Sequence, residues 1–565
     1  MIVGQNPVNV GGRSTSPSTV LEVRALDNPA IAAELGEYGA LLELAGAGPY
    51  AARAFRRAAE LVAAAPVDVA TIVRTGRARE LRGIGPGIDA RLRELVETGT
   101  IAELDELRRT VSPELAALGR LHGFGAGRAI EIGAALGIRT AEELREAAAG
   151  GRLREVRGIG PKTEASIRAA LERPAPPPRR QLRLDQAQAV VERIATALGG
   201  VAAGDPRRWR DKCEWLAVAV PAEDPDEARA RFASLPEIVA MIAPDVGVTV
   251  EGVAIELHAA VPEAFGTALV RATGSPGYLE SLGALPDNPD ENGVFRLLGL
   301  AFVPPELRET GAPPPPPRLV ETTDVRGDLH CHTTASDGRA TVREMAEAAI
   351  ALGYEYLAIC DHTKAVRVVA GLDADDLRRQ AEEIAAANEA HAPFRILRGV
   401  ECDILPDGTL DLPDDVLDEL DWVQLSLHAG QRTPRRELTA RVTHAMAHPA
   451  VRCLSHPTGR LIGRRPENAL DLGRTFETAR ETRVALEVNG LPARLDLSAE
   501  HVAEALAAGV SIVCSTDAHS VAGLLNMRNA VHTARRGAAV PGDVLNTLPL
   551  GALLGGTRFG PAGDY

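Results

Sequence analysis

The segment Asp328-Leu329-His330-Cys331-His332-Thr333 places two histidines one residue apart, and Asp337 follows five residues later. Alternate side chains of a β-strand share a face, so His330 and His332 are expected to point together while Cys331 points away. Imidazole and carboxylate groups are common ligands of divalent metals. This short stretch therefore predicts some of the ligands of a metal site.

The sequence after residue 326 alternates between strand and helix patterns. Helical segments such as Val342–Leu352 and Leu377–Ala387 separate some of the short apolar runs. The runs are Tyr356–Cys360, Phe394–Val400, Trp422–Leu427, Val451–Leu454, Val484–Val488 and Val510–Cys514. Buried strands that alternate with helices predict a parallel α/β sheet or barrel.

Histidines and acids follow these strands at equivalent places. The ends of parallel strands converge on one face of a barrel, so we expect the groups to meet there. One histidine at a strand end is more often a packing residue than a ligand, but six of the 13 histidines follow this pattern. The predicted metal ligands are His330, His332, Asp337, His362, Glu401, His428, His456, Asp517 and His519.

This ligand set predicts chemistry on phosphate esters. Mixed nitrogen and oxygen ligands suit Zn²⁺, Mn²⁺ or Fe²⁺, and nine of them suffice for two or three ions. Such ions polarise a phosphoryl oxygen and activate water. We expect Glu401, His428, Asp517 and Arg460 to form the catalytic centre. The cations Lys364, Arg460 and Arg494 follow ligand motifs and are predicted to hold the substrate phosphate, although each could be a surface charge.

These motifs together resemble the PHP (polymerase and histidinol phosphatase) domain, with all nine of its ligand positions filled. The resemblance covers about residues 326–555 and implies a distorted seven-stranded β/α barrel with three metals. It implies that His330, His332, Glu401 and Asp517 hold one ion. Glu401, with His428 and His456, would hold a second, and Asp337, His362 and His519 would hold a third.

The first third of the chain is expected to be helical and to contact DNA. Residues 79–86, RELRGIGP, recur at 154–161 as REVRGIGP, and a looser copy is LHGFG at 121–125. The three copies resemble helix–hairpin–helix motifs, whose turns offer backbone N–H groups to a DNA phosphate. Residues 1–180 carry 25 Lys and Arg against 22 Asp and Glu, although the whole chain has a net charge of −15. The predicted DNA contacts are Gly83, Gly85, Gly123, Gly125, Gly158, Gly160 and Lys162.

From about residue 25 onward the chain is similar to bacterial family X DNA polymerases that end in a PHP domain. The resemblance implies a multidomain chain with an all-α helix–hairpin–helix region, an α+β palm and thumb, and the α/β barrel. The expected divisions are a disordered tail at 1–22, the helix–hairpin–helix region at 23–176, the palm and thumb at 177–310, a Pro-rich linker at 311–325 and the PHP domain at 326–565.

The palm departs from the family pattern. By register, Trp215 and Ala217 occupy the positions of the two metal-binding aspartates, and Glu256 the position of the third carboxylate. An indole and a methyl group cannot ligate Mg²⁺. We therefore predict that polymerase activity is lost. Arg91 stands where related enzymes carry a Schiff-base lysine, so lyase chemistry is not expected.

Composition sets the remaining expectations. The chain has 565 residues and 45% hydrophobic residues, enough for several folded domains. No run of about 18 apolar residues is free of charges, so no membrane span is predicted. The polar start lacks the order of a signal peptide, and the six cysteines form no CxxC pair. We expect a cytoplasmic protein and assume a monomer.

The sequence leaves three hypotheses about function open. The leading one is a DNA-repair nuclease that trims 3′ ends, with abasic-site cleavage and 3′-phosphate removal as further activities; its partner would be DNA at gaps, nicks or 3′ ends. The second is a small-molecule phosphatase of the histidinol-phosphatase type. The third is a non-catalytic DNA-binding protein, against which the complete ligand set argues.

Overall fold

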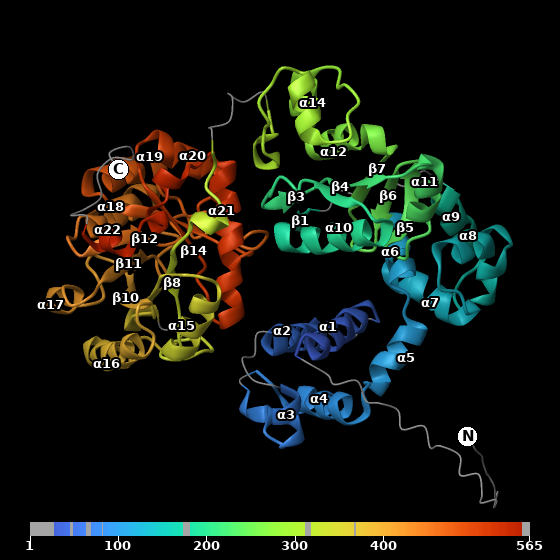
Figure 1. The fold of residues 1–565 in the computed structure, drawn as a ribbon. Coiled ribbons are helices and arrows are strands. Elements are labelled where there is room, and N and C mark those ends of the chain that lie inside the picture. The colour runs from blue at the N-terminus through green and yellow to red at the C-terminus, as the bar shows by residue number, and fades with distance from the viewer. Residues whose placement is uncertain are drawn as a thin grey trace, which may run out of the picture.

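A computed structural model describes residues 28–45, 49–63, 69–81, 83–172, 181–310, 318–366 and 369–555. The tail expected at 1–22 and the proline run Gly311–Pro317 lie outside the described residues. Figure 1 shows a helical region at the N-terminal end, a central α/β region and a C-terminal barrel. No helix in the described ranges combines the length and the apolarity that crossing a membrane requires.

The C-terminal barrel contains seven parallel strands in the order β14-β13-β12-β11-β10-β9-β8. The edge strands meet, because the His332 N–H donates to the Ala518 carbonyl at 2.8 Å and Cys331 pairs with Ala518 in a parallel bridge. The barrel is therefore nearly closed, as predicted. Its strands are β8 (Gly327–Cys331), β9 (Tyr356–Ile359), β10 (Arg395–Asp403), β11 (Trp422–Ser426), β12 (Val451–Leu454), β13 (Ala485–Asn489) and β14 (Ile512–Ser515).

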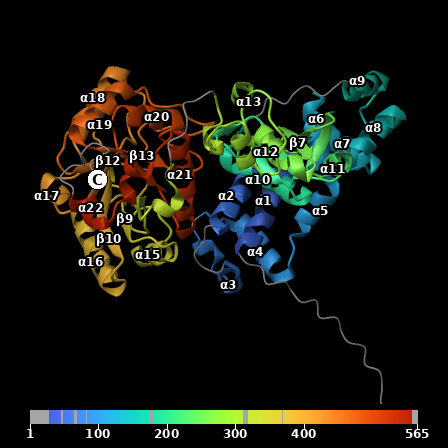
Figure 2. The ribbon, with the colours of Figure 1, turned by 45° about the horizontal axis from the view of Figure 1, so that its top comes forward.

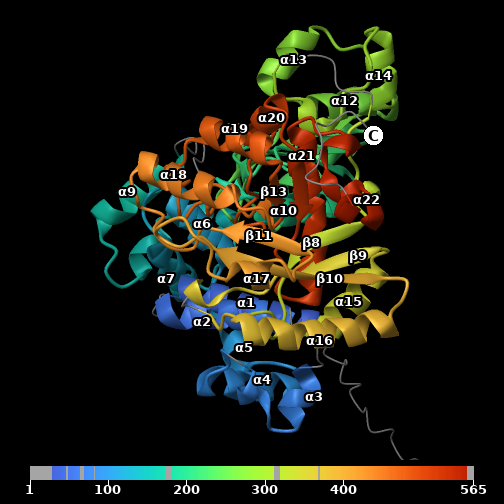
Figure 3. The same cartoon turned by 90° about the vertical axis from the view of Figure 1, so that its left-hand side faces the viewer.

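Helices surround the barrel strands (Figure 3). Several begin at side-chain caps that the sequence supplies: Thr341 and Asp373 each form a capping box with the third helical residue. The helices are α15 (Val342–Ala351), α16 (Ala374–Ala390), α17 (Asp414–Leu417), α18 (Arg435–Met446), α19 (Leu472–Thr482), α20 (Ala499–Ala507), α21 (Met527–Arg536) and α22 (Leu550–Gly555). Leu319, Val320 and Val325 are also buried, so packed structure extends into the segment predicted as linker.

The central region is a five-stranded mixed sheet in the order β2-β4-β7-β6-β5. Apolar side chains of α10 and α11 share one hydrophobic cluster with the sheet, while α12 forms a smaller cluster that includes Ala203 and Ala217. We call this region the palm. Its strands are β1 (Leu182–Arg183), β2 (Val201–Gly204), β3 (Lys212–Cys213), β4 (Leu216–Pro221), β5 (Ile238–Ala243), β6 (Val246–Thr249) and β7 (Ala254–Ala260); its helices are α10 (Leu184–Leu198), α11 (Pro225–Ala233), α12 (Phe265–Thr273), α13 (Pro276–Leu282) and α14 (Glu291–Leu297).

The N-terminal region is helical, as predicted, and forms two hydrophobic clusters. The second cluster includes Val239 and Val248 of the palm sheet, so the helices pack directly on that sheet. Figure 2 shows α1, α2 and α5 beneath the palm. The helices are α1 (Asn28–Leu44), α2 (Pro49–Ala63), α3 (Val69–Arg74), α4 (Pro86–Thr98), α5 (Ala102–Thr110), α6 (Pro113–Leu121), α7 (Ala126–Leu136), α8 (Ala141–Ala149) and α9 (Pro161–Glu172).

The barrel meets the palm through α21, which faces the palm in Figure 1. The Trp209 indole stacks on the His532 ring of α21, with ring centroids 3.7 Å apart and planes tilted by 3°. Ile462 and Leu495, from two barrel loops, belong to the hydrophobic cluster of the palm. The two regions thus share buried apolar surface as well as polar contacts.

Candidate metal centre

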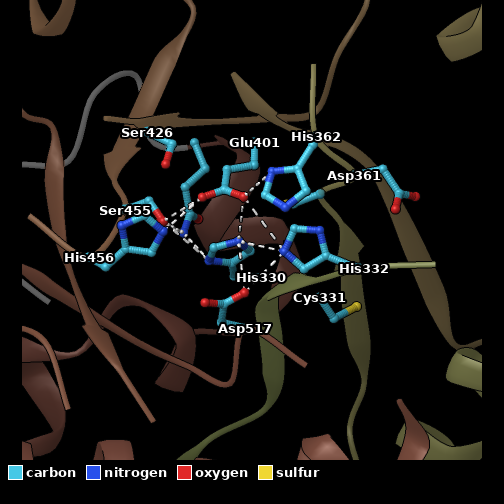
Figure 4. Close-up of polar contacts among 12 residues, drawn as sticks. His330, Cys331, His332, Asp361, His362, Glu401, Ser426, Ser455, His456 and Asp517 are labelled. Atoms are coloured by element: carbon cyan, nitrogen blue, oxygen red, sulfur yellow. Dashed lines mark hydrogen bonds and ion pairs between the residues drawn. The ribbon is translucent and has the colours of Figure 1, made fainter. Parts of the chain in front are cut away.

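The predicted ligands gather at the C-terminal ends of the barrel strands (Figure 4). Alternation along β8 points His330 and His332 into the cluster and the Cys331 sulfur away from it, as the sequence predicts. Glu401 lies inside β10, which continues to Asp403, three residues past the predicted strand end at Val400. The structure contains three groups of potential ligands. Within each group the ligand atoms lie within 4.8 Å of one another, and every residue belongs to the predicted set.

The first group contains His330, His332 and Asp517. The Nε2 atoms of the two histidines are 3.1 Å apart, and Asp517 Oδ1 lies 3.1 Å from His332 Nε2. Glu401 Oε2 lies 3.5 Å from His330 Nε2 and 3.7 Å from His332 Nε2. Three ligand atoms therefore converge, and Glu401 lies beside the two histidines of the group.

Glu401 joins this group to a second one with His362 and His428. Its Oε1 lies 3.5 Å from His428 Nε2 and 2.9 Å from His456 Nε2. Its Oε2 lies 2.8 Å from His362 Nδ1. A carboxylate that faces five imidazoles with two oxygens could bridge two cations.

The third group surrounds Asp337 at the more exposed side of the site. Asp337 Oδ2 lies 3.3 Å from His519 Nε2, and Oδ1 lies 3.6 Å from His362 Nε2 and 3.9 Å from His332 Nδ1. The Asp337 side chain is 21% exposed and that of His519 33% exposed. This group therefore lies nearest to solvent.

Several ligand histidines have one nitrogen fixed by a neighbour, which leaves the other free to bind a metal. His330 Nδ1 donates to Glu487 Oε1 at 2.6 Å, and His428 Nδ1 donates to Asp403 Oδ2 at 3.2 Å. His519 Nδ1 donates to the Asp517 carbonyl at 2.8 Å. In each case Nε2 is the nitrogen that faces the cluster.

Three buried atoms in the cluster make no hydrogen bond of acceptable geometry: His332 Nδ1, His362 Nδ1 and Glu401 Oε2, although the last two lie 2.8 Å from each other. An unpaired buried polar atom costs about 1–3 kcal/mol. Divalent cations among these atoms would satisfy all three. The residues present therefore fit a multinuclear metal site, and their nitrogen and oxygen donors fit Zn²⁺, Mn²⁺ or Fe²⁺.

The carboxylates and His332 have the protonation states that metal binding requires. Burial raises a carboxyl pKa, but the neighbouring histidines, His362 first, outweigh it and hold the pKa of Glu401 well below its usual range. The pKa of Asp517 is likewise held well below its usual range, chiefly by His330 against the effect of burial. Burial and the charges of His519 and His362 lower the pKa of His332 to about 4. Ionised carboxylates and a neutral imidazole are the forms that bind metals. Burial lowers the pKa of His330, His362 and His519, but neighbouring carboxylates outweigh it and raise the pKa, so a bound cation would displace protons from these rings.

The three predicted phosphate-binding cations differ in placement. Arg494 Nε lies 3.6 Å from Asp517 Oδ2, beside the ligand cluster. Lys364 is exposed and pairs with Asp373 and Asp376. Arg460 donates to the backbone carbonyls of Arg494 and Leu495 and pairs with Asp211 of the palm, so its guanidinium faces the palm and not the predicted phosphate.

Sequence reasoning missed two carboxylates of the site, Asp403, which orients His428, and Glu487. Glu487 is completely buried in β13 and accepts hydrogen bonds from His330, from the His456 N–H at 2.6 Å and from Ser515 Oγ at 2.6 Å. Burial raises its pKa, but His330 overcomes this and lowers it to about 2. A signal existed, because Glu487 is an acid in the middle of the apolar run Val484–Val488.

The three hairpins lie where the sequence repeats predicted them. Gly85 and Gly125 precede α4 and α7, and Gly160 precedes α9. Gly83, Gly123 and Gly158 have positive φ angles of 99°, 78° and 82°. Lys162 is exposed in the first turn of α9. Each turn therefore leads directly into a helix N-terminus, where backbone N–H groups are free to bind an anion.

The palm brings together the three positions that the family pattern reserves for carboxylates. Ala217 pairs with Glu256 across β4 and β7, and the Trp215 indole N–H donates to Glu256 Oε2 at 3.0 Å. Asp205 accepts the backbone N–H groups of Glu214 and Trp215 and pairs with Arg208. Within the described residues, the groups able to hold a metal all lie in the barrel.

The fold and site define a class: a helix–hairpin–helix region and a palm joined to a PHP barrel with a cluster of potential metal ligands. A helix–hairpin–helix domain family matches residues 26–101, and the PHP domain family matches residues 328–489. The DNA polymerase/3′-5′ exonuclease PolX of Bacillus subtilis (strain 168) is 35% identical over 547 residues, which cover 90% of this chain and 95% of that protein. The chain therefore belongs to the bacterial family X DNA polymerases that carry a PHP domain.

Shorter relatives align with about a third of the chain. A probable phosphatase of Acetivibrio thermocellus is 32% identical over 201 residues, which cover 34% of this chain and 78% of that protein. A probable phosphatase of Caldicellulosiruptor saccharolyticus is 29% identical over 207 residues, covering 34% of this chain and 79% of that protein. The chain thus has relatives that are named for two different kinds of activity.

Proposed function

We propose that this protein is a metal-dependent DNA phosphodiesterase that removes nucleotides from 3′ ends during DNA repair. The single observation that carries the proposal is the convergence of the nine predicted ligands: eight form three overlapping groups, and His456 contacts Glu401, whose pKa is held well below its usual range. Two or three Zn²⁺, Mn²⁺ or Fe²⁺ ions would polarise the phosphoryl oxygen, activate water and stabilise the leaving oxygen. The Bacillus subtilis relative is named as a 3′-5′ exonuclease as well as a DNA polymerase, which supports the proposal.

The chain's own residues have distinct parts in this proposal. Glu401 and Asp517 hold the cations, and His428, oriented by Asp403, completes the centre. Arg494, beside Asp517, contacts the scissile phosphate. The hairpin turns before α4, α7 and α9 bind the DNA backbone without reading sequence. The palm serves as a scaffold, because Trp215 and Ala217 supply no ligand for the ions that nucleotidyl transfer requires.

The test uses 5′-labelled single-stranded and nicked DNA with Mn²⁺ or Zn²⁺, with and without deoxynucleotides. We expect a ladder of shortened products and no extension. Glu401→Gln should abolish shortening, whereas Glu347→Gln, a matched change on exposed helix α15, should retain it. Metal-dependent shortening that survived Glu401→Gln would refute the assigned centre.

A second candidate is a small-molecule phosphatase, which the probable phosphatases aligned with part of the chain favour. This function predicts rapid hydrolysis of a free phosphomonoester such as p-nitrophenyl phosphate and slow hydrolysis of DNA. The nuclease function predicts the reverse order of kcat/KM. Measuring both substrates on the full chain with the same metal distinguishes them.

A further inference from the structure

Two barrel loops beside the candidate metal centre have their tips buried against the palm. The first loop follows His456 and carries Ile462; the second follows Asn489 and carries Leu495. Leu495 is 1% exposed and Ile462 7% exposed, and both belong to the hydrophobic cluster formed by α10 and the palm sheet. The Ile462 N–H also donates to the Ala493 carbonyl at 2.8 Å, which joins the two loops. The palm thus covers the tips of both loops.

Arg460 ties these loops to each other and to the palm. Its Nε donates to the Arg494 carbonyl at 2.9 Å, and a second nitrogen donates to the Leu495 carbonyl. Its third nitrogen lies 2.9 Å from Asp211 Oδ2. The Arg460 side chain is 10% exposed and that of Asp211 26% exposed. All three nitrogens of the guanidinium are therefore engaged, and Asp211 supplies the close counter-charge from the palm.

The contact between Asp211 and Arg460, which we call the clamp, acts on Arg494, whose side chain reaches the candidate metal centre. Arg460 holds the backbone of Arg494, and the Arg494 side chain extends to within 3.6 Å of Asp517 Oδ2. Losing the Asp211 charge would leave a largely buried guanidinium with its carbonyl partners and, at 4.0 Å, Glu467. A guanidinium in that state is expected to turn toward solvent, which releases the Arg494 carbonyl.

We propose that Asp211 of the palm is a positioning residue for the phosphodiesterase centre, acting through Arg460 on Arg494. The proposal rests on the proposed function for the role of Arg494 and gives the palm a part in hydrolysis. A misplacement of about 1 Å in a substrate-contacting group can cost roughly 100-fold in rate. Asp211→Ala should therefore lower kcat/KM for DNA by roughly 10- to 100-fold, mainly through KM, and leave the metal content unchanged.

A double-mutant cycle on the full chain tests the path. Asp211→Ala, Arg494→Ala and the double variant are compared in kcat and KM with the same DNA. If Asp211 acts through Arg494, the double variant will be no worse than Arg494→Ala alone. If the two losses multiply, the two residues act independently and the proposal is overturned. Asp245→Ala is the matched control, because Asp245 pairs with Arg229 within the palm at 2.5 Å.

A second measurement needs no catalysis. Trypsin cleavage after Arg494 should be faster in Asp211→Ala than in the wild type or in Asp245→Ala, because the released loop becomes accessible. Equal cleavage rates would overturn the proposal. If Asp211→Ala fails to fold, Asp211→Asn, which keeps the shape without the charge, replaces it in both measurements. If the proposed function is wrong, the wild type will not hydrolyse DNA. The rate of trypsin cleavage would still show whether Asp211 holds the loop that carries Arg494.

Discussion

The Glu487 carboxylate orients two predicted metal ligands at once. Its Oε1 accepts His330 Nδ1–H, and its Oε2 accepts the backbone N–H of His456, at 2.6 Å in both cases. Ser455 and Ser515 donate to the same carboxylate. The His330 tautomer and the start of the loop after β12 therefore depend on one buried side chain.

Glu487→Gln is expected to weaken metal binding by roughly 10- to 100-fold. The amide offers one oxygen in place of two, so its NH₂ group would oppose at least one of the present donors. Metal content measured by mass spectrometry after dialysis against increasing chelator gives the affinity. Glu382→Gln, on the exposed face of α16, is the control. Equal metal retention by the two variants would contradict the positioning role of Glu487.

Most of the nine ligands could be predicted from sequence because they follow apolar runs of a repeated strand pattern, and His330 and His332 because alternate residues of a strand share a face. The roles of the basic side chains Lys364, Arg460 and Arg494 could not be predicted, because they depend on which other parts of the chain pack against the barrel. Arg460 follows His456 by four residues, yet its guanidinium faces Asp211, about 250 residues earlier in the chain. Glu401 was predicted because it follows an apolar run, whereas Glu487 escaped detection because it lies inside one, between Leu486 and Val488.

The hairpin turn before α9 offers a test at the scale of one element. Gly158 has a φ of 82°, and a Cβ there would meet only Arg128, at 3.9 Å. Gly158→Ala therefore costs backbone strain of about 1–2 kcal/mol without a clash. We expect fluorescence anisotropy with a labelled oligonucleotide to show DNA affinity reduced roughly five- to tenfold.

Gly137→Ala is the matched control for the hairpin. Gly137 has a φ of 67° at the end of α7, and a Cβ there meets nothing within 4 Å. The same strain arises outside the three turns, so thermal stability should fall in both variants but DNA affinity only in Gly158→Ala. A similar loss of affinity in both would mean that the turn before α9 does not bind DNA.

Strand β4 of the palm carries the prediction about polymerisation. Exonuclease activity could mask slow extension, so the assay uses the Glu401→Gln variant with primer–template DNA, deoxynucleotides and Mg²⁺ or Mn²⁺. We expect no added nucleotide, because Trp215 and Ala217 leave Glu256 as the only carboxylate of the motif, and the indole N–H occupies one of its oxygens. Extension by even one nucleotide would contradict this prediction.

At the scale of elements, sequence patterns located most barrel strands to within two residues. Val451–Leu454 was predicted with both ends correct, while β10 runs three residues past its predicted end. Apolar runs report burial, and β10 continues through Glu401 and Asp403 because these acids are buried by contacts from other strands. The packing of α21 on the palm was not predicted, since contacts between domains leave no periodic signal.

At the scale of the whole molecule, Glu306 links the end of the palm region to α21 of the barrel. Its carboxylate accepts from His532 Nδ1 at 2.8 Å and from Arg535 Nε at 2.6 Å, and the side chain is 3% exposed. Burial raises its pKa, but His532 and Arg535 outweigh burial and lower it from a usual 4.5 to about 2. A depressed pKa means that folding favours the ionised form.

This shift predicts how docking of the palm on the barrel depends on pH. The stabilisation is complete above about pH 4.5 and is lost as the pH falls through about 2, and it amounts to roughly 3 kcal/mol. Glu306→Gln should therefore be less stable than the wild type at pH 7, and the difference should shrink toward pH 2. Trp209 stacks on His532 at this contact, so its fluorescence during urea titration reports undocking. Exposed Glu223→Gln is the control, and a constant difference between Glu306→Gln and wild type across this pH range would show that the Glu306 charge does not hold the two regions together.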